Sequence, residues 1–134
     1  RREAKPLEPR SYGVRRLPMW FERGIWFYLE FNFRLFWWLL FQKADVFLAN
    51  DMDTLLPNWM AARLKRKRLV YDSHEYWTEV PELIARPGPR AVWLRLEKWL
   101  FPKVAAAATV NQSIADIYQE KYGLPVHVIR NVPF

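Results

Sequence analysis

Short apolar runs alternate with helical patterns from residue 45 onward, and this alternation constrains the fold more than any other feature. The runs have the length of strands and occupy 45–49, 69–71, 105–110 and 126–129. Continuous apolar runs are typical of strands covered on both faces, and strands that alternate with helices pair in parallel through right-handed crossovers. The sequence therefore predicts an α/β fold: a Rossmann-like parallel sheet with helices on both faces.

The segments between these runs carry helix signals. They span 54–65, 90–101 and 111–123, and each has apolar residues at helical spacing. The last segment closes at Gly123, which suits the left-handed residue that often follows a helix. Strand and helix thus alternate three times along the chain.

Composition limits the classes of protein that remain. With 134 residues, of which 51% are hydrophobic, the chain can bury the core of one domain. It has no cysteine, which excludes a disulfide framework, a thiolate nucleophile and a cysteine-based zinc site, and which makes the cytoplasm the default location. A net charge of +7 favours anionic partners without choosing among them.

The two ends of the chain indicate a piece of a larger protein. There is no initiator Met or signal sequence at Arg1, and the chain stops directly after an apparent strand. Residues 1–18 are rich in proline and charge and predict an extended connector, whereas 19–134 predict the Rossmann-like domain.

The aromatic segment 20–42 raises the question of whether it spans a membrane. Its charged residues interrupt it, and its longest apolar run is far below the roughly 20 residues that a membrane span needs. Arg23, Glu30 and Arg34 are spaced along one helical stripe, so we expect a helix that packs largely on the sheet with these three side chains outward. A helix lying on an anionic membrane surface is the alternative, because Trp, Phe and Arg also suit the headgroup boundary.

Polar residues gather where the predicted strands end. Ligands of open parallel sheets bind beyond the carboxyl ends of the strands, so we expect Asp51, Asp53, His74 and Glu75 to line one cleft. The strand-end residues with predicted ligand contacts are Asn50, Asp51, Asp53, Thr54, His74, Glu75, Asn111 and Asn131.

Several of these residues have more than one interpretation. Asp51 and Asp53 can cap a helix, contact a polar ligand or hold Mg²⁺ or Mn²⁺. His74 can serve as a general base, as a ligand for phosphate or sugar hydroxyls, or as a structural histidine. The basic run 65–68 reads either as a nucleic-acid patch or as the solvated last turn of a helix, where cations complement the dipole. No Gly-rich phosphate loop, GxSxG elbow or HxxxH motif occurs.

Five blocks in order resemble the N-terminal half of bacterial family 4 glycosyltransferases of the GT-B fold. They read "DVFLANDMDTLLP", "LVYDSHEYWTEVPEL", "RLEKWLFPKV", "TVNQSIADIYQEKYG" and "VIRNVP". The resemblance implies an acceptor-side domain that faces a second, donor-binding domain across a cleft. In this chain the first strand with its Gly-rich turn and the C-terminal donor domain are absent, so we expect the fragment alone to be inactive.

The same resemblance implies the chemistry. His74 matches the histidine that approaches the transferred sugar and its diphosphate, and 50–54 match the acceptor wall. The expected function is transfer of a sugar from a nucleotide-sugar, with retention of configuration, to a polysaccharide or lipid-linked acceptor of the cell envelope. The nucleotide-sugar is a co-substrate, and no metal, other cofactor or nucleic acid is expected. The alternative is a basic membrane-surface or nucleic-acid-binding module without catalysis, and peripheral contact with the inner face of the plasma membrane stays open.

Overall fold

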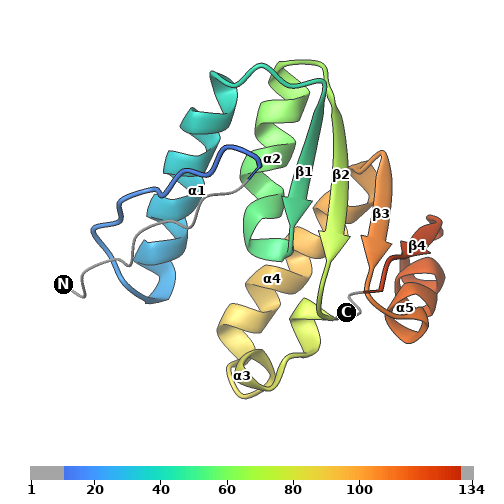
Figure 1. Cartoon of the computed structure of the whole chain (residues 1–134). Coiled ribbons are helices and arrows are strands. Elements are labelled where there is room, and N and C mark those ends of the chain that lie inside the picture. The colour runs from blue at the N-terminus through green and yellow to red at the C-terminus, as the bar shows by residue number, and fades with distance from the viewer. Residues whose placement is uncertain (1–10, 131–134) are drawn as a thin grey trace.

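The computed structural model describes residues 11–130, which form a four-stranded parallel sheet with helices beside it (Figure 1). The strands are β1 Val46–Asn50, β2 Arg68–Ser73, β3 Ala106–Thr109 and β4 Val126–Val128, and they lie in the order β1-β2-β3-β4. All three pairings are parallel. The predicted α/β fold with a Rossmann-like parallel sheet is confirmed.

Five α-helices and two short 3₁₀ helices are found in the described residues. They are α1 Gly24–Leu40, α2 Met52–Leu64, η1 Trp77–Glu79, α3 Pro81–Ile84, α4 Pro87–Leu100, η2 Phe101–Lys103 and α5 Gln112–Tyr122. The left-handed C-terminal residue of α5 is Gly123, at φ 67°, as the sequence predicts.

The helices that pack on the sheet all cover the same face. Neighbouring strands in sequential order, joined by right-handed crossovers, place their connecting helices on one side. The side chains agree, because Phe47 and Ala49 of β1 are buried with the helix residues, whereas Val46 and Leu48 are 51% and 54% exposed. Helices on both faces were expected, but in residues 11–130 the second face of β1 has no helix over it.

Aromatic rings fill the core between the sheet and its helices. Phe101 stacks on Tyr118 and on Tyr122 of α5, with ring centroids 4.6 Å apart in each pair, and meets Tyr71 of β2 edge-on. Each buried ring contributes on the order of 1.5–3 kcal/mol by leaving water. Because these rings come from β2, η2 and α5, they hold the strand that carries the "DSHE" stretch against the last helix.

Helix α1 differs from the prediction in its packing. The helix itself is present over Gly24–Leu40, but it packs mainly against α2 and not on the sheet, and none of its residues is fully buried. Glu30 points inward and not to solvent: its carboxylate accepts hydrogen bonds from the backbone N–H groups of Trp20 and Phe21 and pairs with Arg34 at 2.7 Å. Their spacing predicts that these charged residues face solvent. Instead, Glu30 holds the segment before α1 against the helix through the N–H groups of Trp20 and Phe21.

A proline in α2 explains how the two helices join. Pro57 lies inside α2 and lacks the N–H that would bond to the carbonyl of Asp53. The Asn32 side-chain amide of α1 donates to that carbonyl instead, at 3.2 Å. The unsatisfied carbonyl of one helix thereby becomes the docking point of the other.

The predicted connector 1–18 lies partly outside the described residues. Its part from residue 11 onward forms no helix or strand. The domain boundary at residue 19 stays a prediction.

Candidate functional site

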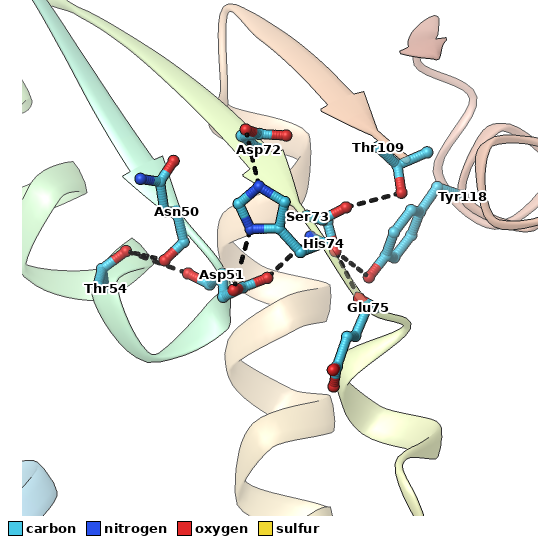
Figure 2. A network of polar contacts seen from close by, with 9 residues as sticks. All are labelled: Asn50, Asp51, Thr54, Asp72, Ser73, His74, Glu75, Thr109 and Tyr118. Atoms are coloured by element: carbon cyan, nitrogen blue, oxygen red, sulfur yellow. Dashed lines mark hydrogen bonds and ion pairs between the residues drawn. The ribbon is translucent and has the colours of Figure 1, made fainter. Parts of the chain in front are cut away.

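The register of β1 and β2 brings two strand ends together. Asn50 pairs with Asp72, so Asp51 follows β1 beside the point where His74 follows β2. The backbone N–H of Asp51 donates to the Asp72 carbonyl at 2.9 Å and continues the ladder one residue beyond β1. Figure 2 shows the resulting network of polar contacts.

The imidazole of His74 lies between two carboxylates. Its Nδ1 is 3.3 Å from Asp51 Oδ2, and its Nε2 is 3.4 Å from Asp72 Oδ2 (Figure 2). The other Asp51 oxygen accepts a hydrogen bond from the His74 backbone N–H at 2.9 Å. Asp51 therefore fixes both the backbone and the ring of His74, while the side chain of His74 remains 37% exposed.

Asp51 holds this position in an unusual backbone conformation. Its φ of 61° and ψ of 168° fall in a region that is essentially reserved for glycine. Holding another residue there costs on the order of 1–3 kcal/mol and persists only where surrounding contacts enforce it. The bonds to Asp72 and His74 supply that enforcement, and strain of this kind concentrates at functional sites.

Asp53 has a different environment from Asp51. It lies in the first turn of α2, where burial raises the pKa of its carboxyl above the usual 3.8 and the charge of Asp51 raises it further, against the lowering effect of nearby backbone N–H groups. On α1, burial also raises the pKa of the Tyr28 hydroxyl, and the charge of Asp53 adds to that. The charge of Asp51 thus acts on Asp53, and the charge of Asp53 acts on Tyr28 of α1. Within residues 11–130, no hydrogen bond or ion pair joins Asp53 to His74.

Two other predicted residues of this loop play different parts. The Thr54 hydroxyl donates to the Asn50 carbonyl at 2.6 Å, which satisfies backbone at the start of α2. The Asn50 residue is exposed, and its side-chain amide makes no hydrogen bond within residues 11–130. Thr54 therefore supports the loop, whereas Asn50 is available to a ligand.

A second polar cluster fixes the backbone around His74 from the core side. Thr109 Oγ1 donates to the Ser73 carbonyl at 2.8 Å, and Ser73 Oγ donates to the Glu75 carbonyl at 2.6 Å. Ser73 Oγ also lies 3.5 Å from the Tyr118 hydroxyl. Figure 2 shows the Glu75 carboxylate directed away from the imidazole. The backbone of Glu75 belongs to the site, while its exposed side chain does not touch His74.

Of the two remaining asparagines, one caps a helix and the other lies outside the described residues. Asn111 caps α5 through its Oδ1, which accepts from the Ile114 N–H at 2.9 Å. Asn131 lies outside the described residues. The structure thus brings Asp51 and His74 together, as predicted, and does not bring Asp53 or Glu75 into contact with the ring.

Asp72 contacts the His74 ring although it is not among the residues predicted to contact a ligand. It stands two positions before His74, and side chains two apart on a strand share a face. That spacing is the signal that places both side chains on the sheet face opposite the core.

Glu97 is a further residue outside the predicted set, and unlike Asp72 it has no sequence signal. It is fully buried on α4, and its carboxylate accepts hydrogen bonds from Lys121 Nζ and the Tyr122 hydroxyl, both at 2.6 Å, with Thr78 Oγ1 3.5 Å away. Burial alone would lower the pKa of Lys121, but the hydrogen bond to Glu97 and the charge of Glu97 raise it overall. The network ties α4, α5 and η1 together and anchors the segment that follows His74.

Metal ligation is one interpretation of the Asp51 and Asp53 pair. The described residues contain no group of three or more His, Cys, Asp or Glu side chains that could hold a metal ion. Asp51 is engaged by the His74 imidazole, whereas the charge of Asp53 acts on Tyr28 of α1.

Comparison with known proteins decides the family. Residues 1–132 match the sequence model described as Glycosyltransferase Family 4. The chain belongs to glycosyltransferase family 4. No curated protein matches the chain. In this family 4 glycosyltransferase chain, the carboxyl edge of the sheet thus carries an imidazole held by a strained aspartate.

We predict that glycine at position 51 is more stable than alanine. Both Asp51→Gly and Asp51→Ala lose the carboxylate contacts, but only Ala keeps the strain, so urea unfolding should favour Gly by about 1–3 kcal/mol. The same pair at Glu120, an exposed interior position of α5, should favour Ala. An Asp51→Ala variant as stable as Asp51→Gly would show that no strain is stored there.

We also predict that Asp53 makes stability fall as the pH rises. Burial raises its folded-state pKa above 3.8, so the folded state holds the proton more tightly than the unfolded chain. The stabilising contribution is therefore present below pH 3.8 and is lost as the pH rises through the folded-state pKa. Asp53→Asn should be more stable than the parent at pH 7 and should converge with it below pH 4 in urea unfolding. Asp116→Asn, at an exposed position of α5, controls for the change in net charge.

Proposed function

We propose that this chain is the acceptor-side domain of a retaining glycosyltransferase that moves a sugar from a nucleotide-sugar to a polysaccharide or lipid-linked acceptor. The observation that carries the proposal is the His74 imidazole, held between Asp51 and Asp72 at the carboxyl edge of a parallel sheet. Ligands of such sheets bind at that edge. The nucleotide-sugar is the co-substrate, and the proposed reaction uses no metal or other cofactor.

In this proposal His74 positions the donor and stabilises charge. Asp51 holds the backbone N–H and Nδ1, so the ring orientation is fixed before the substrate arrives. Nε2, 3.4 Å from Asp72, is the more weakly held nitrogen and is the one assigned to the donor sugar and diphosphate. A fixed polar group at a diphosphate leaving group acts where charge develops in the transition state, and it needs no reorganisation at that moment.

The residues around His74 take supporting roles in the proposal. Asn50 and Glu75 have exposed side chains and are assigned to the acceptor, whereas Thr54 shapes the loop through the Asn50 carbonyl. Asp51 and Asp53 complete the acceptor wall. Asn111 and Asn131 follow the next strands and are assigned to the far side of the cleft.

A contact with an anionic membrane surface is proposed alongside catalysis. Helix α1 exposes a stripe of large apolar side chains at helical spacing: Trp26, Leu29, Phe33, Trp37 and Phe41. Trp20, 77% exposed, lines an apolar hollow of about 540 Å³ together with residues of this stripe and of α2. No helix in the described part of the chain is long and apolar enough to cross a bilayer.

The exposed rings fit the boundary of a bilayer better than open water. Leaving so many rings in water costs on the order of several kcal/mol, and a helix with an aromatic stripe lowers that cost by lying in the headgroup boundary. We assign the protein to the cytoplasmic side of the plasma membrane, where a lipid-linked acceptor would be found. A nucleic-acid partner is not proposed.

We predict that His74→Ala lowers sugar transfer by the full-length enzyme by roughly a hundredfold or more, since loss of one preorganised donor costs about 3 kcal/mol in the transition state. Transfer is measured with purified enzyme and saturating donor. His127→Ala, which removes the exposed histidine of β4, is the matched control and should leave transfer unchanged.

The companion measurements separate positioning from metal chemistry. Asp51→Asn should act more through acceptor affinity than through the rate at saturation, and transfer should survive a chelator. Thermal melting checks that each variant is folded. A His74→Ala enzyme with normal turnover, or activity abolished by the chelator and restored by Mn²⁺, would contradict the proposal.

We predict that the α1 stripe sets membrane affinity. Phe33→Ser with Trp37→Ser should weaken flotation with phosphatidylglycerol-containing vesicles by at least about tenfold, because each ring that leaves water is worth on the order of 1.5–3 kcal/mol. Val92→Ser with Ile117→Ser removes exposed apolar side chains from α4 and α5 and is the matched control. Equal loss in both double variants, or no flotation of the parent, would rule out α1 as the contact.

A further inference from the structure

A basic hollow lies at the opposite edge of the sheet from His74. It has a volume of about 790 Å³, and its lining residues lie where β2 and β3 begin and where α2 and α4 end. Its lining residues are Trp59, Ala62, Arg63, Arg66, Lys67, Arg68, Leu69, Trp99, Lys103, Val104 and Ala105. The site proposed around His74 uses none of them.

The hollow concentrates positive charge without acidic residues in its lining. Five of the lining residues are cationic and none is Asp or Glu. Lys67 pairs with Asp45 at 2.7 Å. The guanidinium groups of Arg63, Arg66 and Arg68 make no hydrogen bond or ion pair with any residue in 11–130. Three unpaired guanidinium groups around one hollow repel one another, and an anion would relieve that repulsion.

The backbone at Arg66 gives independent support. Arg66 follows α2 at φ 55°, in the left-handed region where glycine is strongly favoured. The hydrogen bonds Arg66 N–H to Arg63 O at 3.2 Å and Lys67 N–H to Ala62 O at 2.8 Å complete a Schellman motif, whose left-handed residue is usually Gly. Arginine at this position therefore makes the folded chain less stable than glycine would, and a role in binding would explain its presence.

Tryptophan rings form the apolar wall of the hollow. Trp59 and Trp99 meet edge to face with centroids 4.8 Å apart, and Lys103 Nζ lies 4.9 Å from the Trp99 ring centroid. Rings beside cations exclude water from one side of the hollow. Because screening is weaker there than on an open surface, attraction to an anion is stronger.

We propose that this hollow is a binding site for a phosphate group. Guanidinium groups present paired donors that match phosphate oxygens, and here they come from α2, the turn after it and β2. The phosphate can belong to a soluble phosphorylated molecule or to a phospholipid headgroup.

The lipid source is compatible with the position of α1. Lys65 Nζ donates to the Leu40 carbonyl at 2.8 Å and also to the Gln42 carbonyl, so the end of α1 lies beside the end of α2 that borders the hollow. Phe41, the last member of the exposed aromatic stripe, stands at that end. The lipid source rests on the membrane contact proposed above, whereas the phosphate site itself does not.

The experiment measures binding of two probes to the full-length protein. Pyrophosphate is titrated by calorimetry, and vesicles of phosphatidylcholine with and without phosphatidic acid are tested by co-sedimentation. Arg66→Gly with Arg68→Gln should weaken binding by about tenfold or more, since it removes two charge-assisted contacts. Arg95→Gln with Lys98→Gln, at exposed positions of α4, removes the same charge and should change binding less than about twofold.

Arg66→Gly alone separates binding from folding. Because it relieves the left-handed conformation, it should raise the melting temperature while it weakens binding, which a merely structural arginine would not do. Undiminished binding by this variant would remove Arg66 from the site.

The remaining outcomes identify the source or overturn the site. Pyrophosphate binding that depends on the hollow indicates a soluble ligand, and binding confined to phosphatidic acid vesicles indicates a headgroup. Absence of both at millimolar probe, or equal weakening in the two double variants, overturns the proposal. An oligonucleotide that binds through these residues when neither probe binds would overturn it in favour of a nucleic-acid site. Transfer activity is not a readout here, so failure of this site and failure of the proposed catalysis are told apart.

Discussion

The link between Asp51 and His74 is the contact on which the proposed site depends. Parallel pairing of β1 with β2 brings two strand ends side by side, but pairing alone does not fix a side chain beyond the ladder. Asp51 does so by accepting from the His74 backbone N–H at 2.9 Å and by lying 3.3 Å from Nδ1. The position of the ring therefore follows from the register of the sheet and from one carboxylate held in a glycine-like conformation.

The site lowers stability, and the surrounding structure offsets that loss. Asp51 stores backbone strain, and burial raises the pKa of Asp53 because its charged form is poorly solvated. On the core side, Thr109 and Ser73 satisfy the backbone around His74, and the buried Glu97 carboxylate anchors the segment after it. Backbone strain beside a hydrogen-bonded supporting network is the pattern expected of a preorganised binding site.

The sequence predicts local features of this chain well and its packing less well. Periodicity predicts the strands and the end of α5 at Gly123. The geometry of parallel sheets predicts that Asp51 and His74 lie close together. The packing of α1 on α2 does not, because it depends on a carbonyl left free by Pro57 and filled by Asn32, residues 25 positions apart. Glu97 shows the same limit, since a single glutamate in a helix is usually solvated and only the tertiary fold brings Lys121 and Tyr122 to it.

Charge is distributed unequally between the two edges of the sheet. At the carboxyl edge, Asp51 and Asp72 flank His74, so that edge is not a basic surface. Three arginines without ion pairs in the described residues instead gather at the amino edge, around a hollow walled by tryptophan. A fold that needed basic residues only for solubility would disperse them and would place glycine at the left-handed position of Arg66. The cluster of arginines at this edge is the feature on which the proposed phosphate site, opposite the proposed site of transfer, depends.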